Sequence, residues 1–366
     1  MSKAAQLAAL IGSGQAQGNR NLIINGGMNV AQRSASVTGI GATSGYFTLD
    51  RFKTTFGATS AGRFTMSQST VADLEGFSNA LKVDCTTADT SIAAGELFVI
   101  QNPLEGLNLQ RLKASSSATK AFTLSFYAKS NASRAIATEF EFTNGTNKQI
   151  SKLHTIGTSW ARYTMTVPAA SSTQIDDDNS SELTINFWLH AGSTYTSGTI
   201  NNDALAPTTS ANRAPGIGSL FASTNNTLEI TGIQFELGEQ ATPFEHENFG
   251  TTLAKCQRYF HRFQSDTPYD AFAPAYWLVT TQVYSVYEFP VTMRTQPSLA
   301  ISGTSDWRIH SNGGDGGLGS LVANRSTPNN MQTYSDQSGA TGTAGHAGAI
   351  RNNNTASAYI EFSAEL

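Results

Sequence analysis

Aromatic and polar side chains alternate with apolar ones at residues 183–190. If this run is a strand, Asn186, Trp188 and His190 fall on the face opposite the apolar set. A tryptophan between hydrogen-bonding side chains can present an aromatic platform to a sugar ring. Tyr127 lies on the polar side of a second alternating run. The sequence predicts glycan-binding candidates at these four residues, with the alternative that a second layer, a loop or a neighbouring subunit covers them.

Two glutamates could form a catalytic pair. Glu139 and Glu141 occupy consecutive positions on one strand face, roughly 7 Å apart. That separation is compatible with an inverting glycosidase, in which one carboxyl acts as acid and the other as base. Such pairs are common on solvent-facing strands, and no neighbouring residue indicates a pocket that would raise a carboxyl pKa. The sequence therefore predicts no catalytic residue and a chain that is not an enzyme.

An acidic turn at residues 176–179 could hold a cation. Oxygen-rich turns can bind Ca²⁺, but consecutive carboxylates cannot all point at one ion. We expect a solvated turn, with a Ca²⁺ site near Asp176 and Asp178 as the alternative. The six histidines show no HxH or HExxH spacing, so the sequence predicts no metal cluster and no cofactor.

Strands must position these residues. Residues 21–244 contain about eleven runs of strand character, separated by turns rich in Gly, Ser, Thr and Asn. Two of the runs, at residues 122–129 and 183–190, alternate cleanly, as in an antiparallel sheet with one dry face. No helix-period run lies between the strands. The pattern predicts an all-β jelly-roll β-sandwich, with a long surface excursion at residues 191–227.

The run at residues 227–244 is expected to close this domain. Its apolar residues change phase after Gly232, which predicts one extra residue there, a β-bulge. Gly238 and Pro243 then end the strand.

A helix and a second β domain are expected to follow. Residues 251–263 place apolar side chains at helical spacing. Strands should resume at residues 276–289, 298–302, 307–310 and 358–365. Residues 311–355 are rich in Gly, Asn, Ser and Thr and are expected to form long loops. We therefore predict a jelly roll at residues 21–247 and a smaller β domain, opened by a short helix, at residues 248–366.

The N-terminal residues predict a short anchoring helix. Ser2 can cap it, and Leu7, Leu10 and Ile11 form one apolar stripe. A helix of about ten residues is marginal alone in water, so it is expected to dock on its own domain or on another molecule. Residues 1–20 are therefore predicted to be a helical anchor and a linker.

Charge and composition exclude several classes of protein. Of the 366 residues 14% are charged, the net charge is -4 and no Lys/Arg cluster occurs, which argues against a nucleic-acid partner. Cys85 and Cys256 lie far apart, so the chain is not a disulfide scaffold. No stretch approaches the ~20 apolar residues of a membrane span, so membrane insertion is not expected, and nothing marks the chain for secretion.

Several motifs in combination resemble one family. They are NLIINGGMNVAQRS (residues 21–34), YFTLDRF (residues 46–52), FTLSFYAKS, LTINFWLHAGSTYTSGT, ITGIQFELG with ATPFE, and LAKCQRYF. With these motifs the chain resembles a group of bacteriophage virion proteins, mostly tail-fibre or fibre-like proteins of marine phages. The resemblance extends to FPVTMRTQPS (residues 289–298) and does not include residues 311–355, where receptor specificity is therefore expected.

The resemblance implies a jelly roll similar to carbohydrate-binding modules, usually in homotrimers, and no catalytic residue. The chain would be a virion protein made in the cytoplasm of the host bacterium. As a tail fibre or adhesin, it would join other virion proteins through residues 1–20 and bind a host glycan or surface protein. A short N-terminal segment replaces the long anchoring domain of many short-tailed phage fibres, which leaves attachment to tail or head open. A head fibre or capsid decoration protein and a polysaccharide depolymerase are the alternatives.

Overall fold

The computed structural model describes residues 18–366 except 59, 172, 313 and 337–341. The predicted anchor helix with Leu7, Leu10 and Ile11 lies outside the described residues. In the part of the chain that the structure describes, no helix is long and apolar enough to cross a membrane.

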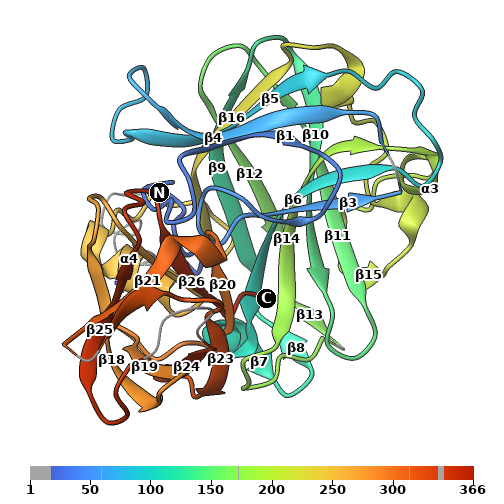
Figure 1. The fold of residues 1–366 in the computed structure, drawn as a ribbon. Coiled ribbons are helices and arrows are strands. Elements are labelled where there is room, and N and C mark those ends of the chain that lie inside the picture. The colour runs from blue at the N-terminus through green and yellow to red at the C-terminus, as the bar shows by residue number, and fades with distance from the viewer. Residues whose placement is uncertain (1–17, 59, 172, 313, 337–341) are drawn as a thin grey trace. The chain divides into compact units, whose positions relative to one another are not determined.

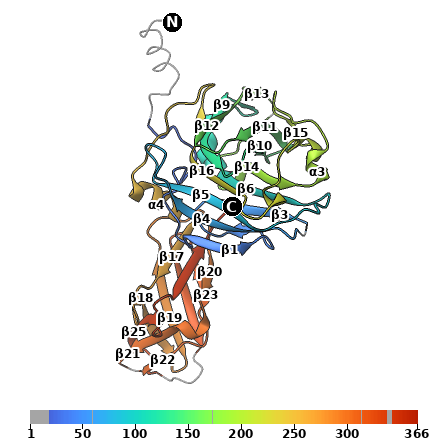
Figure 2. The ribbon, with the colours of Figure 1, turned by 90° about the horizontal axis from the view of Figure 1, so that it is seen from above.

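The described chain forms two compact units. One runs to Thr252 and includes Leu366, and the other is Leu253–Glu365. Each unit has its own hydrophobic core. Both are built mainly of strands (Figures 1 and 2).

The first unit is a sandwich of two antiparallel sheets. Sheet A has the strand order β1-β4-β5-β16-β9-β12, and sheet B has the order β15-β11-β10-β14-β6-β3-β2. The strands of sheet A are β1 (Ser36–Ile40), β4 (Arg63–Thr70), β5 (Asn79–Thr87), β9 (Phe122–Ser130), β12 (Ala161–Val167) and β16 (Thr227–Leu237). Those of sheet B are β2 (Gly45–Tyr46), β3 (Lys53–Gly57), β6 (Leu97–Glu105), β10 (Arg134–Phe142), β11 (Lys148–Ile156), β14 (Ser181–Ala191) and β15 (Ala206–Pro207). A small third sheet consists of β7 (Lys113–Ser115), β8 (Ala118–Thr119) and β13 (Ala170–Ser171).

The order of the strands confirms the predicted all-β fold, a jelly roll followed by a smaller β domain. The chain alternates between the sheets, because β5, β9, β12 and β16 belong to sheet A whereas β6, β10 and β14 belong to sheet B. Connections that cross between two facing sheets are typical of double-sheet jelly rolls. The described helices of this unit are short turns: α2 (Gly106–Leu109), η1 (Gln110–Leu112), α3 (Ser193–Thr196), η2 (Ser210–Asn212) and η3 (Leu220–Ala222).

Inward side chains of both sheets form one core. Leu183, Ile185 and Phe187 of β14 are at most 1% exposed. Rings join the two sheets, as between Phe122 of β9 and Phe140 of β10, whose centres lie 4.9 Å apart edge to face. Burying each such side chain contributes about 1.5–3 kcal/mol, so the alternating pattern determines which faces meet.

The outer face of sheet B is buried as well, along the whole middle of β14. All residues from 182 to 190 are buried, not only the apolar ones. Around Trp188, the excursion predicted at residues 191–227 covers this face. Residues 192–226, here called the cover segment, pack on this face through a cluster that contains Val99, Ala137, Trp188 and Ala214.

β16 contains the predicted bulge. Its register with β9 shifts between Thr231 and Gln234, and Gly232 has a φ of 58°. A Cβ atom at Gly232 would lie 2.7 Å from Phe77 and 2.9 Å from Tyr127, so this crowded, left-handed position requires glycine. β16 lies between β5 and β9, in the middle of sheet A.

The second unit also contains two antiparallel sheets, with the orders β17-β26-β20 and β22-β21-β25-β18-β19-β24-β23. The strands are β17 (Phe260–Gln264), β18 (Ala271–Val279), β19 (Gln282–Glu288), β20 (Ser298–Ile301), β21 (Trp307–Ser311), β22 (Gly314–Gly317), β23 (Val322–Ser326), β24 (Asn330–Asp336), β25 (Ala347–Asn352) and β26 (Tyr359–Ser363). A helical turn, η4 (Thr304–Asp306), precedes β21. Trp277, Trp307 and Ile350 belong to the core of this unit.

Two predictions for the C-terminal part were wrong. Helix α4 (Phe249–Gln257) ends before Phe260 and Phe263, which belong to β17 instead. The backbone groups of β17 form hydrogen bonds with β26. This pairing outweighs the helical spacing of the apolar side chains. Residues 311–355 contain β22 to β25 rather than long loops. A strand ladder uses backbone groups, so a segment rich in Gly and Asn can join one.

Candidate functional site

The outer face of sheet B holds three of the four predicted glycan-binding residues. Asn186, Trp188 and His190 follow one another along this face of β14 and are 0%, 1% and 0% exposed. Tyr127 lies on β9 in sheet A, where its ring centre is 5.2 Å from that of Phe77. The structure therefore brings three of the candidates together and separates the fourth from them.

Trp188 is not an open platform for a sugar ring. The ring centre of Tyr195 lies 5.3 Å from that of Trp188, and the Arg213 guanidinium carbon lies 4.9 Å from the same ring. The indole Nε1 donates a hydrogen bond to Glu139 Oε2 at 2.9 Å. Trp188 therefore presents no exposed platform. The structure instead agrees with the alternative that a loop covers this residue. Alternation indicates the face on which a side chain lies, but not what packs against that face.

Glu139 and Glu141, beside Trp188, are bridged by one arginine of the cover segment. Arg213 donates from Nε and Nη2 to the two oxygens of Glu139, each at 2.8 Å, and from Nη2 to Glu141 Oε2 at 2.5 Å. Asn186 Nδ2 donates to Glu139 Oε2 at 2.8 Å. These five residues, Glu139, Glu141, Asn186, Trp188 and Arg213, are called the paired cluster below.

Burial sets the electrostatics of the paired cluster. Burial raises the pKa of the Glu139 carboxyl, and Arg213 acts in the opposite direction. Burial alone would lower the pKa of Arg213, but Glu139 and Glu141 raise it above its ordinary value, so the guanidinium stays charged. The Glu139 side chain has no exposed surface. The cluster can fasten the cover segment to the sheet, whereas acid–base chemistry would need a carboxyl within reach of a substrate.

A cavity of about 270 Å³ lies on the same face, between β11 and the part of the cover segment that contains β15. It is lined by Gln149, Thr199, Ile200, Asn201, Ala206, Pro207, Thr209 and Asn212. At the edge of sheet B, β15 pairs with β11 and places Ala206 opposite Gln149. Asn201 Nδ2 donates to the backbone oxygen of Gln149 at 2.9 Å and so holds the opposite wall. Gln149 is itself opposite Glu141 in the sheet, so the cavity lies one strand from the paired cluster.

The side chain of Gln149 borders this cavity. Its side chain is 1% exposed, and within the described chain neither Oε1 nor Nε2 has a hydrogen-bond partner. Buried polar groups are nearly always paired, and leaving one unpaired costs about 1–3 kcal/mol. A buried donor and acceptor beside a cavity are therefore positioned to meet water or a ligand. We call this cavity the Gln149 pocket.

The sequence does not single out Gln149 as a site residue. The only local signal is a polar residue in a strand-like run, and many exposed strand residues share it. The walls come from residues 199–212, which have no periodic pattern that would place them over β11.

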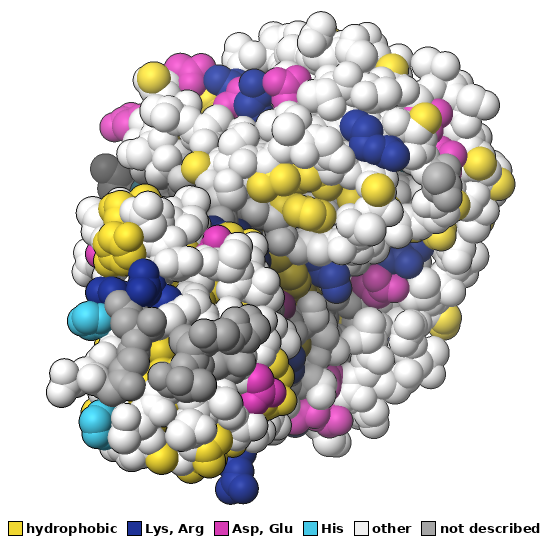
Figure 3. Space-filling model, in the orientation of Figure 1, with side chains coloured by type: hydrophobic (Ala, Val, Ile, Leu, Met, Phe, Trp, Pro, Cys, Tyr) yellow, Lys and Arg dark blue, Asp and Glu magenta, His cyan; other side chains and the backbone are white. Residues whose placement is uncertain are grey.

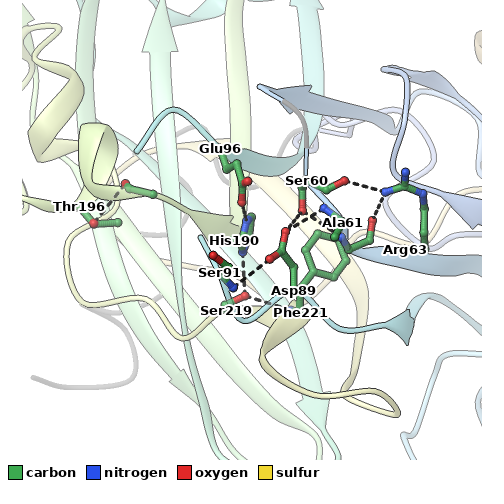
Figure 4. A network of polar contacts seen from close by, with 12 residues as sticks. Ser60, Ala61, Arg63, Asp89, Ser91, Glu96, His190, Thr196, Ser219 and Phe221 are labelled. Atoms are coloured by element: carbon green, nitrogen blue, oxygen red, sulfur yellow. Dashed lines mark hydrogen bonds and ion pairs between the residues drawn. The ribbon is translucent and has the colours of Figure 1, made fainter. Parts of the chain in front are cut away.

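His190, at the far end of β14, belongs to a second polar network (Figure 4). Its Nε2 lies 3.2 Å from Glu96 Oε2, and its Nδ1 lies 2.7 Å from Ser219 Oγ. Asp89 in the same network accepts a hydrogen bond from Ser60 Oγ at 2.7 Å. Burial lowers the pKa of the His190 imidazole, against the opposite effect of Glu96. The hydrogen bond from Ser60 lowers the pKa of the Asp89 carboxyl.

The acidic turn lies apart from these sites. Asp176 and Asp178 are exposed. The Asp178 carboxylate accepts hydrogen bonds from the backbone N and the Oγ of Ser180, at 2.9 and 3.1 Å. Binding of Ca²⁺ at this turn stays a prediction.

No protein-family model matches the chain. No curated protein sequence is significantly similar to it.

Several solved structures are similar to part of the chain. The enzymatically active domain of tailspike protein 4 of bacteriophage CBA120 matches at 12% identity with a TM-score of 0.32, over 60% of this chain and 22% of that chain. A family 11 carbohydrate-binding module of a Clostridium thermocellum cellulase matches at 13% identity with a TM-score of 0.28, over 59% of this chain and 100% of the module. A family 30 carbohydrate-binding module matches at 11% identity with a TM-score of 0.30, over 60% and 97% of the two chains. Likeness at this level carries no argument about function.

Proposed function

We propose that this chain is a subunit of a virion appendage, a tail fibre or adhesin that binds a host-surface glycan without catalysis. The motifs at residues 21–34 and 46–52, together with the four that follow them, support the virion assignment through their resemblance to phage fibre proteins. Assembly as a homotrimer and docking on other virion proteins through residues 1–20 are parts of this proposal.

The unpaired amide of Gln149 carries the glycan-binding part of the proposal. A sugar hydroxyl both donates and accepts hydrogen bonds, so neighbouring hydroxyls match the Nε2–H and Oε1 atoms of one amide. The pocket volume of about 270 Å³ is slightly below the roughly 300–1,000 Å³ of sites for drug-sized ligands. The pocket therefore suits one sugar residue of a longer glycan.

The lining of the pocket indicates a weak, neutral site. None of its described lining residues is charged or aromatic, so binding there would rely on hydrogen bonds without ring stacking. Three copies of the pocket in a homotrimer would compensate for weak binding at each one through avidity. On the face drawn in Figure 3, the charged side chains are scattered over a mostly uncharged surface.

A row of tyrosines in the second unit is a second candidate for glycan contact. Tyr276, Tyr284 and Tyr334 lie opposite one another on β18, β19 and β24, with successive ring centres 5.9 and 6.2 Å apart. Tyr276 is 39% exposed. Rings presented on a sheet surface can pack against the apolar faces of sugars. Tyr334 also lies within residues 311–355, where receptor specificity is expected.

The paired cluster supports binding without hydrolysis. A glycosidase needs a carboxyl that can give its proton to the leaving group. Glu139 is instead held by Arg213, Asn186 and Trp188 and has no exposed surface. Glycans that bind the chain should therefore yield no new reducing ends after prolonged incubation, and turnover would instead support the depolymerase alternative.

Binding of the full chain to a glycan array, followed by titration of each glycan that binds, tests the site. Gln149→Leu should weaken binding at least about tenfold, because leucine keeps the volume of the side chain and loses both hydrogen bonds. Gln264→Leu, at an exposed glutamine of β17, is the matched control and should bind as the wild type does. Tyr284→Ala distinguishes the tyrosine row from the pocket. If Gln149→Leu binds normally, the pocket is not the glycan site.

Cryo-electron microscopy of intact particles tests the virion role. We expect copies of the chain at the tail. Copies distributed over the icosahedral shell would support the head-fibre or decoration alternative, and particles without the chain would contradict the virion assignment.

A further inference from the structure

Three buried side chains from separate segments converge at the end of β14. Asp89 and Glu96 stand on either side of a mostly exposed loop, and His190 lies on the strand. One ligand atom from each residue lies within 4.8 Å of the others. The three side chains are only 5%, 3% and 0% exposed. We propose that Asp89, Glu96 and His190 bind one divalent cation of the zinc class.

The charge of this group favours a cation. Among the described residues, no ion pair joins Asp89 or Glu96 to a lysine or arginine. Arg63, drawn beside the group in Figure 4, donates instead to the backbone oxygens of Ser60 and Gly62, at 2.8 and 2.7 Å. Two buried carboxylates with no lysine or arginine paired to them are unfavourable, and one divalent cation neutralises both.

The donor set selects the type of metal. The three residues supply one imidazole nitrogen and two carboxylate oxygens. Zn²⁺ accepts histidine nitrogen together with carboxylate oxygen, whereas Ca²⁺ and Mg²⁺ prefer oxygen ligands alone. Three protein ligands leave the fourth position of a tetrahedral zinc site for water.

Ser219 orients the imidazole for metal binding. Its Oγ accepts a hydrogen bond from Phe221 N at 3.0 Å and lies 2.7 Å from His190 Nδ1. A hydroxyl oxygen has two lone pairs, so it can also accept from Nδ1–H. The Nε2 lone pair then faces Glu96 Oε2, 3.2 Å away, and a metal ion between them relieves the repulsion.

Asp89 is held in a comparable way. Its carboxylate accepts from Ser60 Oγ at 2.7 Å, from Ala61 N at 2.8 Å and from Ser91 N at 3.1 Å (Figure 4). A carboxylate offers about four acceptor positions, so one remains for a metal ion. Hydrogen bonds of this kind to the ligating groups are typical of metal sites.

The cation would join three segments of the first unit. It would tie the loop between Asp89 and Glu96 to β14 and, through Ser219, to the cover segment that walls the Gln149 pocket. The site would therefore stabilise the covered face of sheet B. This proposal does not depend on glycan binding.

Metal content and thermal unfolding of the full chain test the site. After EDTA treatment and dialysis against ZnCl₂, elemental analysis should find about one zinc per chain. At a free zinc concentration one hundred times the Kd, the melting temperature of the first unit should rise by about 5–11 °C. Ca²⁺ and Mg²⁺ at the same concentration should not reproduce the rise. A chain that retains no zinc and melts at the same temperature with and without it would overturn the proposal.

Glu96→Gln distinguishes a metal site from a hydrogen-bonded network. Glutamine can still form a hydrogen bond with His190 Nε2, through its side-chain N–H or oxygen, but it has no charge, so the EDTA-treated variant should melt as the wild type does. Its zinc affinity should fall at least about tenfold. Asp178→Asn, in the exposed acidic turn, is the control and should keep the zinc-dependent rise. A normal rise in Glu96→Gln would overturn the proposal.

Co²⁺ provides a second test that needs no variant. Wild-type chain with Co²⁺ should develop visible absorption bands of low-symmetry coordination, and stoichiometric Zn²⁺ should abolish them. Failure of Zn²⁺ to displace Co²⁺, or the absence of bands, would count against the site even if Glu96→Gln does not fold.

Discussion

The paired cluster and the Gln149 pocket lie on the same face of sheet B, one strand apart, and they differ in how the chain satisfies buried polar groups. In the cluster, Glu139 accepts hydrogen bonds from Arg213, Trp188 and Asn186. In the pocket, both amide atoms of Gln149 have no partner within the described chain. The same segment covers both regions, so burial does not distinguish them. The chain therefore satisfies the buried polar groups of the paired cluster internally and leaves those of Gln149 without a protein partner.

Arg213→Ala, in the paired cluster, is expected to have the largest effect on stability. It leaves Glu139 buried without its counter-charge, so the free energy of unfolding of the first unit should fall by about 3–5 kcal/mol. Urea unfolding followed by tryptophan fluorescence measures the change. Lys152→Ala, at an exposed position, should change the same quantity by less than about 0.5 kcal/mol. A loss below about 1 kcal/mol for Arg213→Ala would show that the cluster is not what fastens the cover segment.

Acid should lower the free energy of unfolding of the first unit and leave the glycan affinity of the Gln149 pocket unchanged. Burial lowers the pKa of His154 from 6.5 to about 4. The folded chain therefore binds this proton less readily than the unfolded chain does. The stabilisation is complete above pH 6.5 and is lost as the pH falls toward 4, by up to about 3 kcal/mol. Unfolding of the first unit measured against pH should show this fall, and His154→Gln should remove the part that this residue contributes.

The described lining of the Gln149 pocket contains no titratable side chain. The glycan affinity of the folded chain should therefore be the same at about pH 7 and pH 5. A parallel loss of affinity and stability would mean that the two regions are coupled.

Gln149→Leu should have the smallest effect on stability, and of opposite sign. Removing an unpaired buried amide should raise the free energy of unfolding by up to about 1 kcal/mol. Gln101→Leu is the matched control on the same sheet, because its Nε2 donates to Asn186 Oδ1 at 2.8 Å. Gln101→Leu should lower stability by about 1 kcal/mol. Equal losses in the two variants would show that water already satisfies Gln149 and would remove the contrast.

Backbone periodicity predicted more of the fold than of the site. Alternation placed Asn186, Trp188 and His190 on one face of β14, and the phase change at Gly232 located the bulge. Both inferences use only residues that are close together in the sequence, because the two-residue period of a strand is visible there.

The cover over that face could not be predicted in the same way. Residues 192–226 have no periodic pattern, so nothing in their sequence indicates the surface on which they pack. Asp89, Glu96 and His190 come from separate segments and meet only after the sheets have formed. The one local hint was the size of Trp188, because a large ring on a polar face usually has a partner.

β16 lies between β5 and β9, although both are synthesised long before it. Until residue 237 has left the ribosome, each of these strands has one unpaired edge inside the future sheet. Unpaired edges associate with other chains, and contacts between distant segments form slowly. Translation rate, temperature and chaperone supply during this interval should therefore govern the yield of folded chain more strongly than the final stability does.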